Sequence, residues 1–427
     1  MKTVGIIAEF NPFHNGHKYL IEQAKQQTGA DCCIVLMSGD FVQRGAPAIC
    51  NKYLRTEMAL KGGADIVFEL PTVYALGSAE MFAEGAVSLL AATGQIDYLC
   101  FGSESGDTDA LSKCASIIEE YTMTPAFKEQ LTDHIKNGES YPSAFSNALS
   151  EVLGSLQSLL YSPNNLLGIE YLRALIRLEK DDTSSFSAAN FSKLPKPLAI
   201  RRMGSDHFDT EITEFSSATA LRTSMLSGNE LQKLSKSIPD ESYSMISDKH
   251  GHLLPISEDD FSNMLYMRLN TLTYEELFAI PDINPDLIHK LIDYRGYQII
   301  IPKLIMSLKS KCFTYTSISR ALFRILLCPA YKDAVLQNKA GYAPLSARSN
   351  DCKPYLRLLG FNKKSSEFLR TLRYSDHIEI ITKPADGPLA DSSYNLDIYA
   401  SSLYEQVCSD KFKDKFIEEL KSGPIII

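Results

Sequence analysis

The chain lacks long apolar runs, paired cysteines and a visible secretory leader. No apolar stretch approaches the roughly 18 residues that a membrane-spanning helix needs, so a membrane protein is not expected. The nine cysteines are scattered without a CxxC pair, which argues against a zinc site or a disulfide framework and favours reduced thiols. A strand pattern begins almost directly after Met1, where a signal peptide would need a longer apolar region. The expected location is therefore the cytoplasm.

Basic residues are fewer than acidic residues overall, but they are concentrated in one segment. The chain has 43 Lys and Arg against 52 Asp and Glu, a net charge of -9. Residues 290–373 nevertheless contain 16 basic and 4 acidic side chains, which leaves 27 basic and 48 acidic elsewhere. A basic segment on an acidic body indicates a polyanionic partner such as RNA. The alternative is a solvated basic surface without a partner.

Strand and helix patterns alternate through the first hundred residues. Buried strands are predicted at 3–10, 32–39, 65–71 and 97–104, with helices between them, and a further short strand at 196–204. This order predicts an α/β fold with a doubly wound parallel sheet, in which ligands bind beyond the carboxyl ends of the strands. Mostly helical patterns predict an insertion at about 107–190. A nucleotide-binding domain at 1–235 and a mostly helical, basic domain at 236–427 are expected.

The first predicted strand leads into "FNPFHNGHKYL", which places His14 and His17 at the start of a helix. A helix N-terminus attracts phosphate, and Gly16 leaves room for a close approach. Two imidazole donors there suit the charge that develops on the α-phosphate when pyrophosphate leaves ATP. The alternatives are zinc binding, which needs a third ligand, and ordinary capping or core histidines. No GxxxxGK[ST] motif occurs, so a P-loop enzyme is not expected.

Several motifs together resemble one family. "FNPFHNGHKYLIEQA" resembles the signature of the HxGH nucleotidyltransferase superfamily, and "SSATALR" resembles its second element, with Ser217, Thr219 and Arg222 as the matching residues. "MSGDFVQRGAPA", "FGSESGD", "SPNNLLGIEYLRAL", "IRRMGSDHFD" and "YLRLLGF" resemble, in this order, the blocks of the tRNA(Met) cytidine acetate ligase family. These blocks span nearly the whole chain.

The resemblance implies a Rossmann-like nucleotidyltransferase fold and a specific reaction. ATP would activate acetate as acetyl-adenylate, and the acetyl group would pass to N4 of the wobble cytidine of elongator tRNA(Met), giving N4-acetylcytidine without acetyl-CoA. Mg²⁺ is expected to travel with ATP, and no metal site in the protein is predicted. No obligatory protein partner is predicted. No residue of the sequence points to a base for the acetyl-transfer step.

The resemblance also implies the site residues. Catalytic roles would fall to His14, His17 and Arg222. Asn165 is preferred over Asn164 as an ATP ligand, and Arg202 over Arg201. The complete set of implied ATP-binding residues is Ile7, Ala8, Glu9, Phe10, Asn11, Pro12, Phe13, His14, Asn15, Gly16, His17, Lys18, Tyr19, Leu20, Gly102, Asn165, Arg202, Ser217 and Thr219.

The basic segment supplies candidate tRNA-binding residues. "LKSKCFTYTSISRALFR" mixes basic side chains with aromatic ones, which suits phosphate contacts and base stacking. The alternative is that the aromatic residues belong to the core. The predicted tRNA-binding residues are Lys309, Lys311, Arg320 and Arg324.

Other roles and functions remain compatible with the sequence. Asp40, Gln43 and Arg44 follow the second predicted strand, where a ligand role and a loop-stabilising role are both open. The protein could instead be an adenylyltransferase, an acetate ligase that acts on citrate lyase, or a non-catalytic RNA-binding protein. The basic segment favours RNA over a protein acceptor, and the intact histidine pair argues against loss of catalysis.

Overall fold

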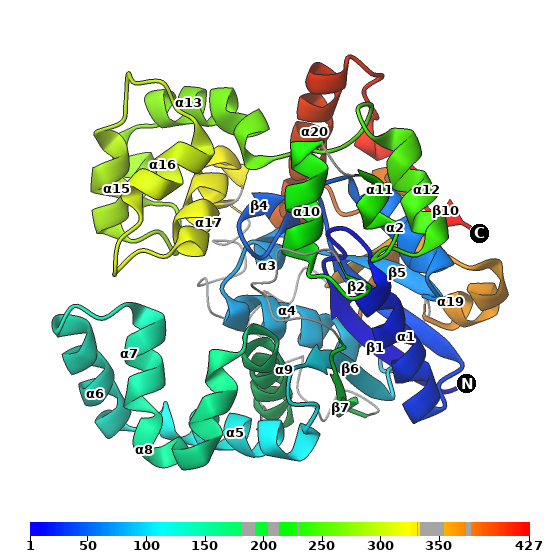
Figure 1. Cartoon of the computed structure of the whole chain (residues 1–427), viewed down its shortest axis with the longest axis horizontal. Helices are drawn as coiled ribbons and strands as arrows, with labels where there is room; N and C mark the ends of the chain where they lie inside the picture. Colours follow the sequence, from blue (N-terminus) through cyan, green and yellow to red (C-terminus); the bar gives the residue numbers. More distant parts are fainter. Residues whose placement is uncertain (181–192, 204–212, 229–230, 331, 334–353, 373–376) are drawn as a thin grey trace.

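The computed structural model describes residues 1–180, 193–203, 213–228, 231–330, 332–333, 354–372 and 377–427. An eight-stranded sheet forms its centre, in the order β10-β8-β5-β2-β1-β6-β7, with β9 beside β8 (Figure 1). Within the described residues, β5–β8 is the one antiparallel pair of this sheet. The strands are β1 Thr3–Ala8, β2 Cys32–Ser38, β5 Ile66–Leu70, β6 Tyr98–Ser103, β7 Lys196–Arg201, β8 Tyr355–Phe361, β9 Glu379–Ile381 and β10 Ile425–Ile426.

The strands send alternate side chains into two apolar layers. In β1, Val4 and Ile6 pack in one layer with α1, α2, α10 and α12, while Ile7 packs in the other with α4, α5 and α9. Because helices cover both faces, the strands are continuous apolar runs. The predicted doubly wound α/β class is confirmed. The helices of these layers are α1 Asn15–Thr28, α2 Lys52–Lys61, α3 Thr72–Ala75, α4 Ala79–Ala92, α5 Thr108–Tyr121, α9 Pro163–Lys180, α10 Ala218–Ser227, α11 Leu231–Leu234 and α12 Asp240–Lys249.

Two further groups of helices extend from the sheet, one at the lower left and one at the upper left of Figure 1. Between α5 and α9 lie α6 Pro125–Lys136, α7 Tyr141–Ala148, α8 Ser150–Leu153 and the 3₁₀ helix η1 Gly154–Tyr161. Residues 181–190 of the expected insertion are outside the described residues. The second group comprises η3 Glu258–Phe261, α13 Ser262–Thr271, α14 Tyr274–Phe278, α15 Pro285–Ile292, α16 Ile301–Leu308 and α17 Tyr315–Leu326. No helix in the described ranges is both long enough and apolar enough to cross a membrane.

The C-terminal part is mostly helical, as expected, but it also contributes the strands β8, β9 and β10 to the central sheet. Strand β8 pairs with β5, and β9 and β10 flank β8, so residues 355–427 complete the sheet that begins at Thr3. The expected boundary at 235/236 therefore does not separate two independent folds. The physical reason is that β5 would otherwise be an unpaired edge strand. The remaining elements are η5 Lys363–Ser365, α19 Ser366–Leu372, η6 Pro384–Asp386, α20 Ser392–Phe412 and η7 Glu419–Lys421.

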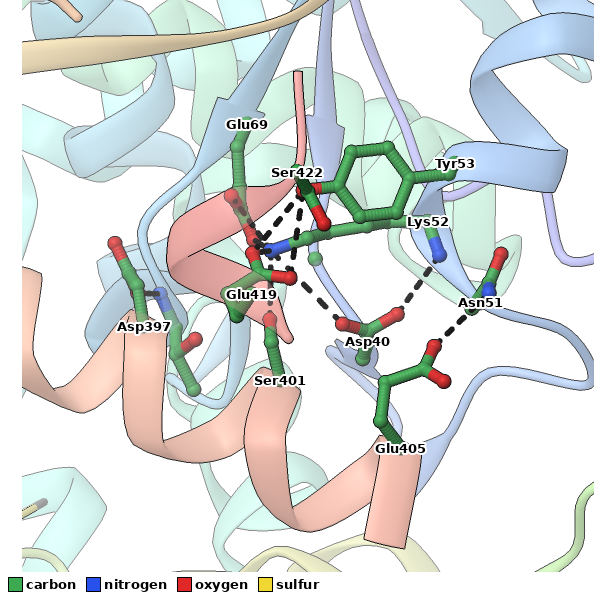
Figure 2. Close-up of polar contacts among 12 residues, drawn as sticks. Asp40, Asn51, Lys52, Tyr53, Glu69, Asp397, Ser401, Glu405, Glu419 and Ser422 are labelled. Atoms are coloured by element: carbon green, nitrogen blue, oxygen red, sulfur yellow. Dashed lines mark hydrogen bonds and ion pairs between the residues drawn. The ribbon is translucent and has the colours of Figure 1, made fainter. Parts of the chain in front are cut away.

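A buried charge cluster fastens this C-terminal segment to the sheet (Figure 2). Lys52 Nζ lies 2.8 Å from Glu69 Oε1 and 2.6 Å from Glu419 Oε1. Arg357 of β8 forms ion pairs with the same two carboxylates, and Lys52 Nζ also donates to Ser401 Oγ of α20. All four charged side chains are buried. Charges from α2, β5, β8 and η7 therefore neutralise one another where the C-terminal segment packs against the N-terminal part of the sheet.

Candidate active site

The N-terminus of α1 is built around the two histidines. His14 caps the helix: the Gly16 N–H donates to His14 Nδ1 over 3.1 Å, and the His14 N–H donates to His17 Nδ1 over 3.3 Å. The two rings stack with their centroids 3.7 Å apart. A Cβ at Gly16 would lie 2.9 Å from His14 Cε1, so glycine lets the ring fold over the first turn. The predicted helix start is confirmed, and the motif forms a reciprocal capping box.

Both imidazoles are neutral in the folded protein. Burial, followed by the charges of Arg202 and Arg222, lowers the pKa of His14 to about 3. Burial, followed by the effects of His14 and Arg202, also lowers the pKa of His17 well below its ordinary value. Since each Nδ1 accepts a hydrogen bond, the proton of each ring is assigned to Nε2. The pair therefore offers two uncharged N–H donors, and arginines supply the positive charge.

Helix α10 brings one of those arginines to the histidines. Ser217 caps α10 through its hydroxyl, and Arg222 lies just over one turn along. Arg222 Nη1 donates to the Asn11 carbonyl oxygen over 2.8 Å, and its Nη2 donates to Thr219 Oγ1 over 3.1 Å. Burial, followed by the charge of Arg44, lowers the pKa of Arg222 to about 10, so it stays cationic at neutral pH. The two sequence motifs are thus joined by a direct hydrogen bond.

These groups line a cavity of about 580 Å³ at the carboxyl ends of the central strands. Its α1 and α10 side is polar, whereas Phe82 of α4, Phe101 of β6 and Tyr171 of α9 line the opposite side. Of the predicted ATP-binding residues and Arg222, those that line the cavity are Ile7, Ala8, Glu9, Phe10, Asn11, His14, Gly16, His17, Tyr19, Leu20, Gly102, Arg202, Thr219 and Arg222. Those that do not are Pro12, Phe13, Asn15, Lys18, Asn165 and Ser217.

The ends of β6 and β7 and the start of α9 form another wall of this cavity. Gly102 lies on the wall, and Arg202 Nη1 donates to Asn164 Oδ1 over 3.4 Å. Asn165 is buried behind Asn164 and accepts a backbone hydrogen bond of 3.1 Å from the loop after β6. This placement favours Asn164 over the predicted Asn165. Arg201 and Arg202 both reach the cavity, so the choice between them stays open.

A short hairpin of β3 Phe41–Val42 and β4 Ala46–Pro47 borders the same cavity. Gln43 and Arg44 line it, and the Gln43 N–H donates to Glu9 Oε1 over 2.9 Å. The fully buried Arg55 donates to the Glu9 carbonyl oxygen over 2.8 Å and to a carbonyl at the end of β2 over 3.0 Å. Asp40 does not reach the cavity and instead accepts a hydrogen bond from the backbone of α2. Asp40 therefore stabilises the loop, while Gln43 and Arg44 face the cavity.

The four predicted tRNA-binding residues do not share one surface. Lys309 and Lys311 are exposed after α16. Arg320 of α17 lines the cavity beside the hairpin. Arg324 is buried and donates to carbonyl oxygens of Asp282, over 3.0 Å, and of the loop after α3, over 2.9 Å. The prediction for Arg324 is wrong because its guanidinium satisfies backbone acceptors inside the protein.

Sequence reasoning missed two groups of aromatic residues. Phe82, Phe101 and Tyr171 sit on apolar helix and strand faces and look like ordinary core residues in the sequence. The second group of helices, η3 to α17, is called the outer helical group below. On it, Tyr294 and Tyr297 line a surface groove together with Lys290, Gln298 and Lys309. Phe313, an aromatic residue of "LKSKCFTYTSISRALFR", is buried, which agrees with the alternative that it belongs to the core. A signal was available for the groove, since Tyr294 and Tyr297 lie inside the basic segment.

Comparisons with known proteins show which family this chain is similar to. A family model described as HIGH Nucleotidyl Transferase matches residues 1–419. A Clostridium kluyveri protein named tRNA(Met) cytidine acetate ligase is 35% identical over 100% of this chain and 99% of its own length. A protein of the same name from Clostridium perfringens is 36% identical over 95% of both chains.

The chain belongs to the tRNA(Met) cytidine acetate ligase family. A solved structure of Thermotoga maritima TmcAL bound with alpha-thio ATP matches it with a TM-score of 0.82 and 26% identity, covering 100% of both chains. The apo form of that protein matches with a TM-score of 0.83. The two motifs that resemble the HxGH nucleotidyltransferase superfamily lie within the residues matched by the family model. The relatives that match nearly the whole chain carry the name of the tRNA(Met) cytidine acetate ligase family, so the resemblance stated from the sequence is confirmed.

Proposed function

We propose that this protein is an ATP-dependent ligase that forms acetyl-adenylate and transfers the acetyl group to N4 of the wobble cytidine of elongator tRNA(Met). The observation that carries the proposal is the convergence of two neutral imidazole donors and Arg222 on one cavity at the start of α1. The full-length relatives named tRNA(Met) cytidine acetate ligase support the substrates, and the structure with an ATP analogue supports the nucleotide.

The first step needs charge stabilisation more than proton transfer. Acetate is an anion at neutral pH, since carboxyl pKa values lie near ~4, so its attack on the α-phosphorus needs no base. The Nε2–H groups of His14 and His17 stabilise the negative charge on the transferring phosphate. Arg222 neutralises the pyrophosphate, which leaves with the electron pair of the broken P–O bond. Mg²⁺ enters with the phosphates of ATP.

The basic surface of the outer helical group suits the tRNA. Lys290, Lys309, Tyr294 and Tyr297 combine ammonium groups with aromatic rings around one groove. Such a groove can bind phosphates and stack unpaired bases. The adjacent α17 packs on the β3–β4 hairpin at the cavity, where Ser319 Oγ donates to the Gly45 carbonyl oxygen over 2.6 Å. RNA held on this group of helices would therefore lie on the element that reaches the active site.

One labelling experiment tests the function. Purified protein receives radiolabelled acetate, ATP and bulk tRNA, and the labelled macromolecule and the nucleotide products are identified. We expect label in tRNA(Met) with release of AMP and pyrophosphate, and no replacement of acetate and ATP by acetyl-CoA. ADP and phosphate as products would indicate acyl-phosphate chemistry instead. Label in a protein acceptor would support the citrate lyase alternative, and absence of any label would support a non-catalytic RNA-binding protein.

The two exposed lysines give a prediction about tRNA binding. In a Lys309→Ala/Lys311→Ala double variant, the slope of log affinity against log salt concentration should fall by up to about 1.8, at ~0.7–0.9 per lost phosphate contact. Acetate-dependent adenylate formation without tRNA should change little, because both residues lie outside the active-site cavity. Filter binding across a salt series measures the slope.

The control for this variant is Lys128→Ala/Lys136→Ala, which removes two exposed lysines from α6. It should leave the slope within error of wild type. An equal fall in both double variants would mean that the salt dependence reflects overall charge and not a localised tRNA surface.

A further inference from the structure

The cavity has a second side, opposite the histidines and Arg222. The histidines, Arg222 and Thr219 all come from the α1 and α10 side of the sheet. On the other side, Phe82, Phe101 and Tyr171 form an aromatic recess, in which the Phe101 and Tyr171 ring centroids are 5.7 Å apart. An aromatic recess opposite a phosphate-binding helix end suits a flat base and not a charged phosphate chain.

Glu9 is the carboxylate at the entrance of this recess. It follows β1 directly, and the alternation of that strand puts it on the same face as Ile7, which packs in the layer of α4 and α9. Its negative charge contributes, after burial, to the raised pKa of Tyr171, so the carboxylate lies near that ring. Glu9, Tyr171 and Arg222 all line the same cavity, and the charge of Glu9 also acts against the lowering of the Arg222 pKa.

The hydrogen bonds of Glu9 leave one oxygen available. Oε1 accepts the Gln43 N–H, and Arg55 holds the Glu9 carbonyl oxygen, so the residue is fixed in position. Among the described residues, Oε2 has no hydrogen-bond partner. A carboxylate repels both the phosphates of ATP and the acetate ion, whereas it accepts hydrogen bonds readily from an amino group. The group that fits beside Oε2 is therefore an N–H donor.

Given the proposed function, we infer that the aromatic recess holds the acceptor cytosine and that Glu9 accepts a hydrogen bond from its N4 amino group. Cytosine presents N4–H₂ as a donor at this edge, whereas uracil presents the O4 acceptor, which a carboxylate repels. Glu9 thereby selects cytosine over uracil. It also supplies the base for acetyl transfer, for which the sequence offered no candidate.

The transfer step balances with Glu9 as the proton acceptor. The N4 lone pair attacks the carbonyl carbon of acetyl-adenylate, and a new C–N bond forms. The C–O bond to the phosphate breaks, and AMP leaves with its electron pair. One N4 proton passes to Glu9 Oε2, which returns it to solvent after the product leaves. No oxidant, reductant or further co-reactant is needed.

The test separates the two half-reactions in a Glu9→Gln variant. Adenylate formation is measured as acetate-dependent ATP–pyrophosphate exchange without tRNA, and transfer is measured as a single turnover from preformed acetyl-adenylate to a tRNA(Met) transcript. Transfer should fall by about 10²–10⁴-fold, the usual contribution of a general base, and at least about tenfold more than exchange does. Glu9→Asp, which keeps a carboxylate, should recover part of the transfer rate. Glu22→Gln, on the exposed face of α1, is the matched control and should leave both rates unchanged.

Each outcome decides the inference. Equal losses in both half-reactions, or no loss in either, would overturn the role of Glu9 while leaving the proposed function intact. Wild-type protein without acetate-dependent exchange would instead overturn the proposed function itself. If the glutamine variant is unstable, transfer and exchange are compared in the aspartate variant instead. Its loss of transfer should be smaller, but still larger than its loss of exchange. A tRNA(Met) transcript with uridine at the wobble position should compete poorly with wild-type tRNA, and less poorly in the glutamine variant.

Discussion

The His14→Ala variant should form acetyl-adenylate about 10²–10³ times more slowly than wild type, the loss typical for one donor to a developing negative charge. Its affinity for tRNA should be nearly unchanged, because His14 is buried at the phosphate end of a cavity that neither Lys309 nor Lys311 lines. Acetate-dependent ATP–pyrophosphate exchange measures the first quantity, and filter binding measures the second.

The capping role of His14 requires a control for stability. His14→Asn keeps a side-chain acceptor for the Gly16 N–H, whereas alanine removes it at a cost of about 0.5–2 kcal/mol. Both variants should lose exchange activity, and only the alanine variant should lose stability. His134→Ala, in α6 beside Glu139, should retain full exchange activity. A His14→Asn protein that exchanges at the wild-type rate would contradict the donor role.

The largest loss of stability is expected from Lys52→Met. Removing the ammonium group leaves Glu69 and Glu419 buried with Arg357 as their remaining strong counter-charge, and breaking a buried pair in this way costs about 3–5 kcal/mol. Urea denaturation of both proteins measures the difference in the free energy of unfolding.

Lys421→Met is the matched control for this variant. Lys421 lies two residues from Glu419 and pairs with Glu418, but both of these side chains are largely exposed, so the loss should stay below about 1 kcal/mol. A Lys52→Met protein as stable as the Lys421→Met protein would show that the cluster in Figure 2 contributes little to holding the C-terminal segment on the sheet.

Local patterns predicted the parts of this protein that depend on neighbours in the sequence. The strands β1, β2, β5, β6 and β7 were predicted within a few residues. For β1, β2 and β5 the reason is that burial on both faces makes each strand a continuous run of mostly apolar residues. The histidine pair was predicted at a helix start because a capping box is encoded within four residues. These signals suffice for the fold class and for the phosphate end of the cavity.

Features that depend on distant partners were not visible in the sequence. Strand β8 contains Arg357, whose charge is acceptable in a sheet only because Glu69 and Glu419 lie against it. Arg324 and Lys309 look alike in a basic segment, yet only Arg324 meets buried carbonyl oxygens. Tyr171 has the spacing of a core residue, and only the tertiary arrangement exposes one side of it to the cavity.

The antiparallel pairing of β5 with β8 has a consequence for folding during synthesis. Ile66 and Phe361 are paired across 295 positions of sequence, so a nascent chain that already contains both nucleotide motifs still has an open edge at β5. Such an edge can pair with other chains, and contacts over such long separations form late in folding. The nucleotide half is therefore not a module that folds ahead of the rest. Evolution can lengthen or exchange the helical insertion between β6 and β7 far more easily than it can detach residues 355–427.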